Sequence, residues 1–178
     1  HEVILVVDYG SQYTQLIARR IREQHVFCRI ITPQELTLRR LRREQPKGII
    51  LSGGPASVYQ RRAPLPRHEI FRAGVPTLGI CYGMQAMAHV LGGKVERSPK
   101  REYGKALLTV SKPDGLFTGT RRSFVSWMSH GDSVVKVPPG FFVSARTANT
   151  VSAAMAHPRR RLYGLQFHPE VVHTEQGG

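Results

Sequence analysis

Four short apolar runs recur along the first half of the chain, at residues 3–7, 27–31, 48–52 and 77–80. The first run, Val-Ile-Leu-Val-Val, has no polar alternation, which is typical of a parallel strand buried on both faces. Apolar residues at helical spacing predict helices between and after these runs. We expect these helices near residues 13–24, 32–43, 67–73 and 84–91. Strands that alternate with helices predict an α/β fold, an open, mostly parallel central sheet flanked by helices.

The second half of the chain changes to short strands separated by turns rich in Pro and Gly. We expect these strands near residues 94–96, 106–110, 124–128, 141–145, 151–156 and 162–167. No helical spacing separates them, so antiparallel strands that extend the parallel sheet are predicted. The length of 178 residues fits a single domain.

Charge and cysteine content limit the classes of partner and site. Lys and Arg number 26 against 12 Asp and Glu, a net charge of +14 that suits a polyanion. The arginines are dispersed in pairs without interleaved aromatic residues, which favours a solvated surface or protein interface over nucleic acid. The cysteines, Cys28 and Cys81, lack zinc-site spacing, so we expect no metal. We also expect no membrane span and a cytoplasmic location, because no apolar stretch approaches about 20 residues and no leader is evident.

Cys81 is the candidate nucleophile. It follows the run at residues 77–80, stands between Gly79 and Gly83, and precedes helix-forming residues. A sharp strand-to-helix corner there would lift the thiol out of the sheet, and the following helix N-terminus would favour thiolate. A buried, inert cysteine is the alternative.

His168 and Glu170 form the candidate base and its orienting group. In an extended segment residues 168 and 170 point to the same side, and Pro169 stiffens the pair. His130 competes for the role of base. It lies in a predicted polar loop, Ser129-His130-Gly131-Asp132, and has no acidic residue two positions away. A neutral loop histidine is therefore the favoured interpretation of His130.

Gly53-Gly54-Pro55 follows the third run, and ligands bind outside the carboxyl ends of strands in open α/β sheets. A glycine there could turn its N–H toward the site and, together with the N–H of Tyr82, form an oxyanion hole. A structural turn is the commoner explanation of such a motif. The chain has neither a Gly-x-Gly-x-x-Gly segment after the first run nor a Gly-x-x-x-x-Gly-Lys-Ser/Thr loop. We therefore expect no ATP or NAD binding by those routes.

Taken together, these segments resemble the class I glutamine amidotransferases over essentially the whole chain. The resemblance rests on Gly79-Ile80-Cys81-Tyr82-Gly83-Met84-Gln85, Leu51-Ser52-Gly53-Gly54-Pro55 and Phe167-His168-Pro169-Glu170. Ser11-Gln12-Tyr13-Thr14 and Met128-Ser129-His130-Gly131-Asp132 are similar to the branch whose ammonia serves GMP synthesis. The family's flavodoxin-like fold is then expected.

The resemblance implies glutamine hydrolysis through a cysteine thioester. It makes Cys81, His168 and Glu170 a catalytic triad, with the N–H groups of Gly54 and Tyr82 as the oxyanion hole. It also implies substrate contacts that the spacing does not reveal, from Gln85, Ser129, His130, Gly131 and Asp132. The ammonia would pass to a synthetase that aminates xanthosine monophosphate.

The resemblance also places the remaining chemistry outside this chain. Fused relatives continue with an ATP-pyrophosphatase (synthetase) domain, whereas this sequence stops at Gly178. We therefore expect residues 1–178 to form a single glutaminase domain without a cofactor, with ATP and Mg²⁺ bound only by the partner synthetase. Two alternatives remain open. One is a catalytically silent, amidotransferase-like regulatory module, and the other is an amidotransferase or γ-glutamyl hydrolase of another pathway.

Overall fold

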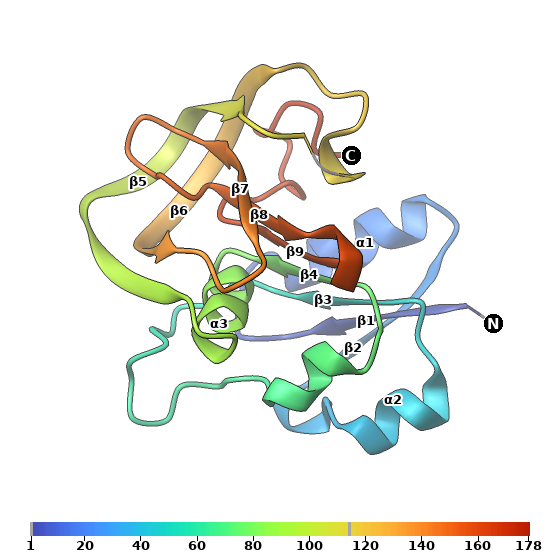
Figure 1. Cartoon of the computed structure of the whole chain (residues 1–178). Helices are drawn as coiled ribbons and strands as arrows, with labels where there is room; N and C mark the ends of the chain where they lie inside the picture. Colours follow the sequence, from blue (N-terminus) through green and yellow to red (C-terminus); the bar gives the residue numbers. More distant parts are fainter. Residues whose placement is uncertain (1, 114) are drawn as a thin grey trace.

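The fold is organised around one mixed β-sheet (Figure 1). The computed structural model describes residues 2–113 and 115–178, and within these residues the sheet has nine strands in the order β2-β1-β3-β4-β9-β8-β7-β5-β6. The strands are β1 (Val3–Val7), β2 (Phe27–Ile31), β3 (Gly48–Leu51), β4 (Thr77–Ile80), β5 (Lys94–Val110), β6 (Ser123–Lys136), β7 (Phe142–Arg146), β8 (Ala154–His157) and β9 (Leu162–Leu165). Strands β2, β1, β3, β4 and β9 are parallel, and the others pair antiparallel.

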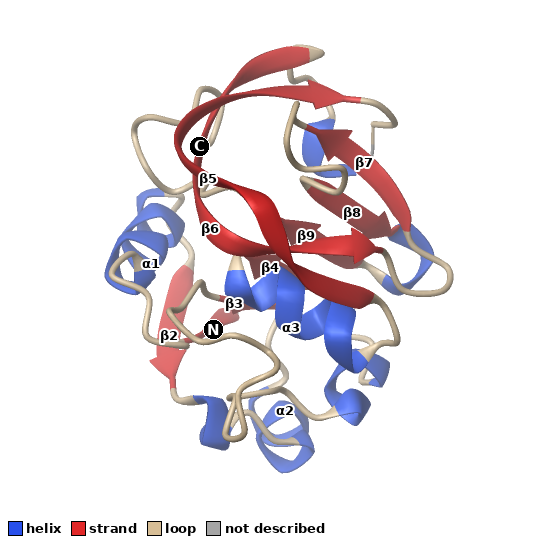
Figure 2. Ribbon diagram, turned by 90° about the vertical axis from the view of Figure 1, so that its left-hand side faces the viewer, coloured by secondary structure: helices blue, strands red, loops and turns tan. Residues whose placement is uncertain are grey.

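Helices cover both faces of the parallel strands, as the sequence predicts. They are α1 (Thr14–Glu23), α2 (Leu38–Glu44) and α3 (Tyr82–Val90). Figure 2 shows α1 on one side of the strands, with α2 and α3 on the other. Alternate residues of β1 accordingly join different core clusters. Leu5 packs in the cluster that includes Met84 and Met87 of α3, whereas Val6 packs with Ile17 of α1. Both faces of β1 are buried, which explains its unbroken apolar sequence.

The segment 32–43 does not form the single helix expected from its capping box. The box itself is present, with Thr32 and Glu35 bonded reciprocally, but it caps only the 3₁₀ turn Pro33–Glu35. Helix α2 then begins separately, and the Thr37 side chain accepts a hydrogen bond of 3.1 Å from the Arg40 N–H. The extended backbone of Thr37 separates the 3₁₀ turn from α2, because Thr37 is the N-cap of α2 and an N-cap residue is not helical. The helix expected at 67–73 is likewise a 3₁₀ helix, His68–Arg72.

The antiparallel half has fewer and longer strands than expected. The segments predicted at 94–96 and 106–110 belong to one strand, β5, and β6 continues well beyond residue 128. These two strands pair with each other along most of their length, with a register shift between Arg97 and Glu102. β5 and β6 thus form a two-stranded ribbon. Many side chains in the middle of β5 are charged and exposed to solvent, so this segment does not show the apolar pattern that predicts a strand.

The last strand also departs from the expected antiparallel arrangement. β9 pairs parallel with β4, from Thr77 opposite Leu162 to Ile80 opposite Leu165. The carboxyl ends of β4 and β9 therefore lie side by side, which brings residue 81 close to the segment after residue 165. In the described part of the chain, no helix is long and apolar enough to cross a membrane.

Candidate active site

A cavity of about 870 Å³ opens at the carboxyl ends of the parallel strands. The loops after β1, β3 and β4 line it, and the middle of the β5–β6 ribbon forms its opposite wall. β1 lies between β2 and β3, so the strand order reverses next to this cavity. Ligands of open α/β sheets bind at such a switch point. The cavity also contains most of the site residues predicted from the sequence: Gly54, Cys81, Tyr82, Gln85, Ser129, His130, Gly131, Asp132 and His168.

Cys81 stands at a strained corner between β4 and α3. Its φ of 53° is rare for a residue with a side chain, and its N–H donates to the Leu165 carbonyl at 2.7 Å. The neighbouring glycines are needed for packing. A Cβ at Gly83 would lie 2.2 Å from the Leu51 carbonyl oxygen, and one at Gly79 would lie 2.6 Å from the Gly83 carbonyl carbon. The predicted strand-to-helix corner is thus present, with the strain located at the thiol.

His168 is held by Glu170 and by β6. Nδ1 of His168 lies 2.7 Å from Oε1 of Glu170, and both side chains are buried. The His168 N–H donates to the Trp127 carbonyl at 2.9 Å, and the Thr174 hydroxyl donates to the His168 carbonyl at 2.6 Å. Residues 169 and 170 form a turn and not the extended segment expected, but Glu170 still reaches the imidazole.

Cys81 and the imidazole of His168 both lie close to Gly53. A Cβ at Gly53 would lie 3.2 Å from Cε1 of His168 and 3.5 Å from Cβ of Cys81. Burial lowers the pKa of His168, but hydrogen bonds and charge from Cys81 and Glu170 outweigh burial and raise it to about 10. The imidazole is therefore protonated at neutral pH as long as the Cys81 sulfur is not acylated.

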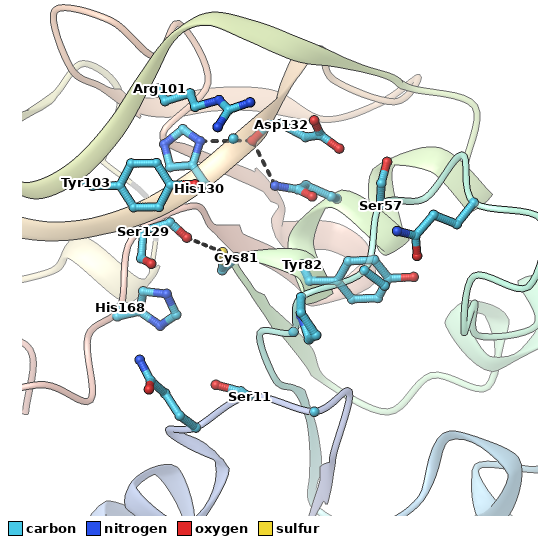
Figure 3. Close-up of a pocket in the computed structure, with 18 of the residues that line it drawn as sticks. Ser11, Ser57, Cys81, Tyr82, Arg101, Tyr103, Ser129, His130, Asp132 and His168 are labelled. Atoms are coloured by element: carbon cyan, nitrogen blue, oxygen red, sulfur yellow. Dashed lines mark hydrogen bonds between the residues drawn. The ribbon is translucent and has the colours of Figure 1, made fainter.

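Two further polar groups contact the Cys81 sulfur. Its thiol donates to the Ser129 carbonyl at 3.5 Å (Figure 3). Nε2 of Gln166 lies 3.6 Å from the sulfur. Gln166 also accepts a hydrogen bond of 3.2 Å from Gln85. Reasoning from the sequence missed Gln166, because nothing in its local pattern distinguishes it from a surface residue beyond a strand end.

The Ser129–Asp132 cluster lies within β6 and is not the loop that the sequence suggested. His130 and Gly131 nevertheless line the cavity (Figure 3). The Asp132 carbonyl accepts a hydrogen bond of 2.9 Å from Nε2 of Gln85. Both N–H groups of the Gln85 amide are thus directed at protein acceptors, Asp132 and Gln166, and its carbonyl oxygen remains for a ligand.

His130 has an acidic partner that sequence spacing did not reveal. Glu102 lies opposite it in the β5–β6 ladder, and Nε2 of His130 is 3.5 Å from Oε2 of Glu102. Nδ1 of His130 lies 2.9 Å from the Asp132 carbonyl. Burial lowers the pKa of His130, and the contacts with Asp132 and Glu102 offset this only in part. The predicted neutral state therefore agrees with the structure, although the reasoning from sequence spacing was incomplete.

The two candidate oxyanion donors lie on the wall next to Cys81. A Cβ at Gly54 would lie 2.2 Å from the Tyr9 carbonyl oxygen, so only glycine fits there. Within the described residues neither the Gly54 N–H nor the Tyr82 N–H donates a hydrogen bond to a backbone carbonyl outside the helices and strands. Two backbone donors beside a nucleophile are the elements of an oxyanion hole.

Several cavity residues are not among the site residues predicted from the sequence. Arg97, Arg101 and Tyr103 of β5 approach from the ribbon, and Ser11 and Tyr13 approach from the loop after β1. Tyr13 packs its ring edge on His168, with 5.1 Å between the ring centres. No group of His, Cys, Asp and Glu that could hold a metal occurs among the described residues.

Comparisons with known proteins agree with this geometry. The family model for glutamine amidotransferase class-I matches residues 5–178. GMP synthase [glutamine-hydrolyzing] of Heliobacterium modesticaldum is 54% identical over 99% of this chain and 34% of its own length. The enzyme of the same name from Thermosynechococcus vestitus is 54% identical over 99% of this chain and 33% of its own.

Solved structures share the fold. One of them, described as a candidate GMP synthase subunit from Thermoplasma acidophilum, superimposes with a TM-score of 0.82 at 28% identity, covering 99% of this chain and 88% of that one. The present chain spans about a third of the length of the curated relatives it matches. The family match covers nearly all of the chain, from the first strand to its last residue. The chain therefore belongs to the class I glutamine amidotransferases.

Proposed function

We propose that the chain hydrolyses the side-chain amide of L-glutamine to glutamate and ammonia, with residues 1–178 acting as one glutaminase domain. The observation that carries the proposal is the strained corner at Cys81 beside a histidine whose Nδ1 is 2.7 Å from the Glu170 carboxylate. A nucleophile, a base and an orienting acid in this order are the parts of a covalent acyl-transfer site.

The first half-reaction forms a thioester. The Cys81 sulfur attacks the amide carbon of glutamine, and the N–H groups of Gly54 and Tyr82 stabilise the negative charge that develops on the amide oxygen. The C–N bond then breaks, and protonated His168 delivers its proton to the departing nitrogen, which leaves as ammonia. The raised pKa of His168 suits this step, because the imidazole begins in its protonated form.

The second half-reaction hydrolyses the thioester. Acylation removes the interactions with the free Cys81 sulfur, which are among the causes of the raised pKa of His168. The pKa then falls, so the neutral imidazole can take a proton from water. The hydroxide equivalent attacks the thioester carbon, the C–S bond breaks, and glutamate leaves with Cys81 restored.

The polar wall of the cavity suits the amino-acid end of glutamine. Arg97 and Arg101 supply positive charge for the α-carboxylate, and Asp132 supplies negative charge for the α-ammonium group. Gln85 offers its carbonyl oxygen nearby. Ser129, His130 and Gly131 complete this wall, since all three line the cavity. A pocket with both charges is selective for a zwitterion over a simple amide.

We also propose that the ammonia serves the amination of xanthosine monophosphate to GMP. The support is the name of the relatives, which are 54% identical and about three times as long as this chain. Their additional length would correspond to the synthetase partner, which would bind ATP and Mg²⁺. A reducing, cytoplasmic setting fits a nucleophile that must remain a free thiol, and both cysteines are free here.

The test is glutamate release from glutamine by the wild-type chain and by Cys81→Ala. The variant should lose activity by at least about 10³-fold, because no covalent intermediate can form. Cys28→Ala is the matched control, since Cys28 is buried and does not line the cavity. Selective labelling of Cys81 over Cys28 by an electrophilic glutamine analogue should accompany activity.

Three outcomes would argue against these proposals. Unchanged turnover in Cys81→Ala would remove the cysteine mechanism. Labelling of neither cysteine, with no glutamate released even when a synthetase partner, xanthosine monophosphate and ATP are supplied, would favour a silent module. Release of glutamate that does not respond to xanthosine monophosphate would favour another pathway.

A further inference from the structure

A second cavity, of about 600 Å³, lies at the opposite end of β4 and β9 from the thiol. Its walls are the 3₁₀ helix His68–Arg72 with Gly74, and the 3₁₀ turn Pro158–Arg160 with Arg161. These segments immediately precede β4 and β9, whose first residues, Thr77 and Leu162, are paired in the sheet. We call this cavity, lined by His68, Phe71, Arg72, Gly74, Arg159, Arg160 and Arg161, the arginine groove.

The arginine groove is positively charged without internal compensation. Four arginines, Arg72, Arg159, Arg160 and Arg161, line it together with His68, and no carboxylate does. Among residues 2–113 and 115–178 none of these arginines forms an ion pair. The nearby carboxylate of Glu69 is instead 3.7 Å from Arg67. Like charges gathered in this way repel one another, so a bound anion would stabilise them.

Two of the guanidinium groups are held in place across the groove. Arg160 donates to the Phe71 carbonyl at 3.1 Å, and Arg161 donates to the Gly74 carbonyl at 2.5 Å. Arg161 is fixed further by its left-handed backbone, with a φ of 54°, and by its carbonyl, which accepts from the Thr77 N–H at 3.0 Å. A guanidinium has five N–H donors, so each arginine retains donors for a ligand. Fixed donors lose little conformational freedom on binding.

The chemistry of the groove favours phosphate groups. Phe71 is 2% exposed, so its ring presents no face for stacking on a base. The size of the cavity falls within the range of small-molecule sites. A phosphate carries more charge than a carboxylate at neutral pH, so a short phosphate chain can neutralise all four arginines within the limited volume. The planar guanidinium also matches phosphate oxygens in pairs.

We propose that the arginine groove is a binding site for a small anion with several linked phosphate groups, separate from the glutamine cavity. Strands β4 and β9 connect the two sites, because Cys81 follows β4 and His168 lies just beyond β9. The site requires no covalent step, and its existence does not depend on the glutaminase reaction.

Calorimetric titration of the 178-residue chain with inorganic tripolyphosphate tests the proposal. We expect saturable binding at one site per chain, and at least about 10-fold weaker binding in Arg72→Gln/Arg159→Gln. Both arginines are exposed and form no hydrogen bond to the backbone carbonyls that hold the groove, so the melting temperature without ligand should stay unchanged. Tripolyphosphate should raise the melting temperature of the wild type, since only the folded chain has the groove.

The matched control is Arg39→Gln/Arg42→Gln, which removes the same charge from exposed positions of α2 outside the groove. It should bind tripolyphosphate within about two-fold of the wild type, apart from the general effect of net charge. Equal weakening in both double variants would overturn the proposal, because it would indicate a nonspecific response to charge. Binding that does not saturate would overturn it too. Tighter binding of citrate than of tripolyphosphate would overturn the choice of phosphate.

Discussion

Two buried histidines line the same cavity, and each has a carboxylate partner. In one pair, Nδ1 of His168 is 2.7 Å from Glu170, two residues away in the sequence. In the other, Nε2 of His130 is 3.5 Å from Glu102, on the neighbouring strand. Their pKa values shift in opposite directions, because contacts with Cys81 and Glu170 outweigh burial at His168, whereas burial prevails at His130.

The first difference is the hydrogen bond with Cys81, which raises the pKa of His168 and has no counterpart at His130. The second is what else each carboxylate holds. Both oxygens of Glu102 accept from the Thr147 hydroxyl, and one accepts from the Thr150 hydroxyl at 2.6 Å. Oε2 of Glu170 has no partner among the described residues, so the negative charge of Glu170 is shared only with His168. A carboxylate near a histidine therefore does not make that histidine a base. The length of the contact and the competing donors decide it.

Replacement of each histidine by asparagine tests this distinction most strongly. His168→Asn should lower kcat/KM by about 10³-fold or more, because it removes the proton carrier for both half-reactions. His130→Asn should lower it by about 10-fold or less, chiefly through KM. Steady-state glutamate release measures both. A larger loss of kcat/KM in His130→Asn than in His168→Asn would make His130 the base in place of His168.

Replacement of the carboxylates should separate function from stability. Glu170→Gln should lower kcat by about 10²-fold, since the amide neither orients nor stabilises the imidazolium as a carboxylate does. Glu102→Gln should leave kcat within a few-fold but lower the free energy of unfolding by about 1–3 kcal/mol, because buried threonine hydroxyls lose a charged acceptor. Kinetics and urea unfolding of both variants provide the comparison. A loss of activity in Glu102→Gln but not in Glu170→Gln would contradict this expectation.

Stability should fall in alkaline solution because of His168. The pKa of His168 is about 10 in the folded chain against an ordinary value of 6.5, so folding retains a proton that the unfolded chain releases. Its stabilising contribution is fully present below pH 6.5 and is lost as the pH rises through about 10. The slope is at most about 1.4 kcal/mol per pH unit.

The measurement is the urea midpoint between about pH 7 and pH 10 for the wild type and His168→Asn. Other groups also titrate in this range, so the difference between the two proteins isolates the histidine. Parallel curves for the two proteins would show that the pKa of His168 is not raised.

The smallest effect is expected at Thr150. Thr150→Val removes the hydrogen bond to Glu102 and the 3.4 Å contact with Nε2 of His130, with little change of shape. It should lower the free energy of unfolding by about 1 kcal/mol. The freed carboxylate oxygen then interacts more strongly with His130, so the pKa of His130 should rise. An NMR titration of the imidazole measures this shift, with His168 as the internal reference. A fall in the pKa of His130 would mean that the lost contact with Thr150 outweighs the influence of Glu102.

Local patterns were sufficient for much of the parallel half and for the candidate triad. The apolar runs that became β1, β3 and β4 were predictable because burial on both faces demands unbroken apolar sequence. Cys81 was predictable because its glycine neighbours belong to the same corner, and Glu170 because it lies two residues from His168. In each case the residues that determine the structure are close together in the chain.

Two other regions were less predictable from the sequence. In the β5–β6 ribbon, charged residues masked the length of β5. In the segment 32–43, a capping box suggested one helix, but two short helical pieces formed. Such errors arise where local preferences compete and a distant contact selects between them.

By itself, the sequence determined the α/β class and the position of the thiol corner, and it predicted His168 and Glu170 as the partners of the thiol. Only the tertiary structure decided that Glu102 faces His130, that Gln166 contacts the sulfur, and that a Cβ at Gly53 would lie close to both Cys81 and His168. It also gathered arginines 72 and 159–161, which are far apart in the sequence, into one groove. The reason is physical: these contacts join residues on separate strands and loops, and sheet pairing, not local sequence pattern, sets which of them meet.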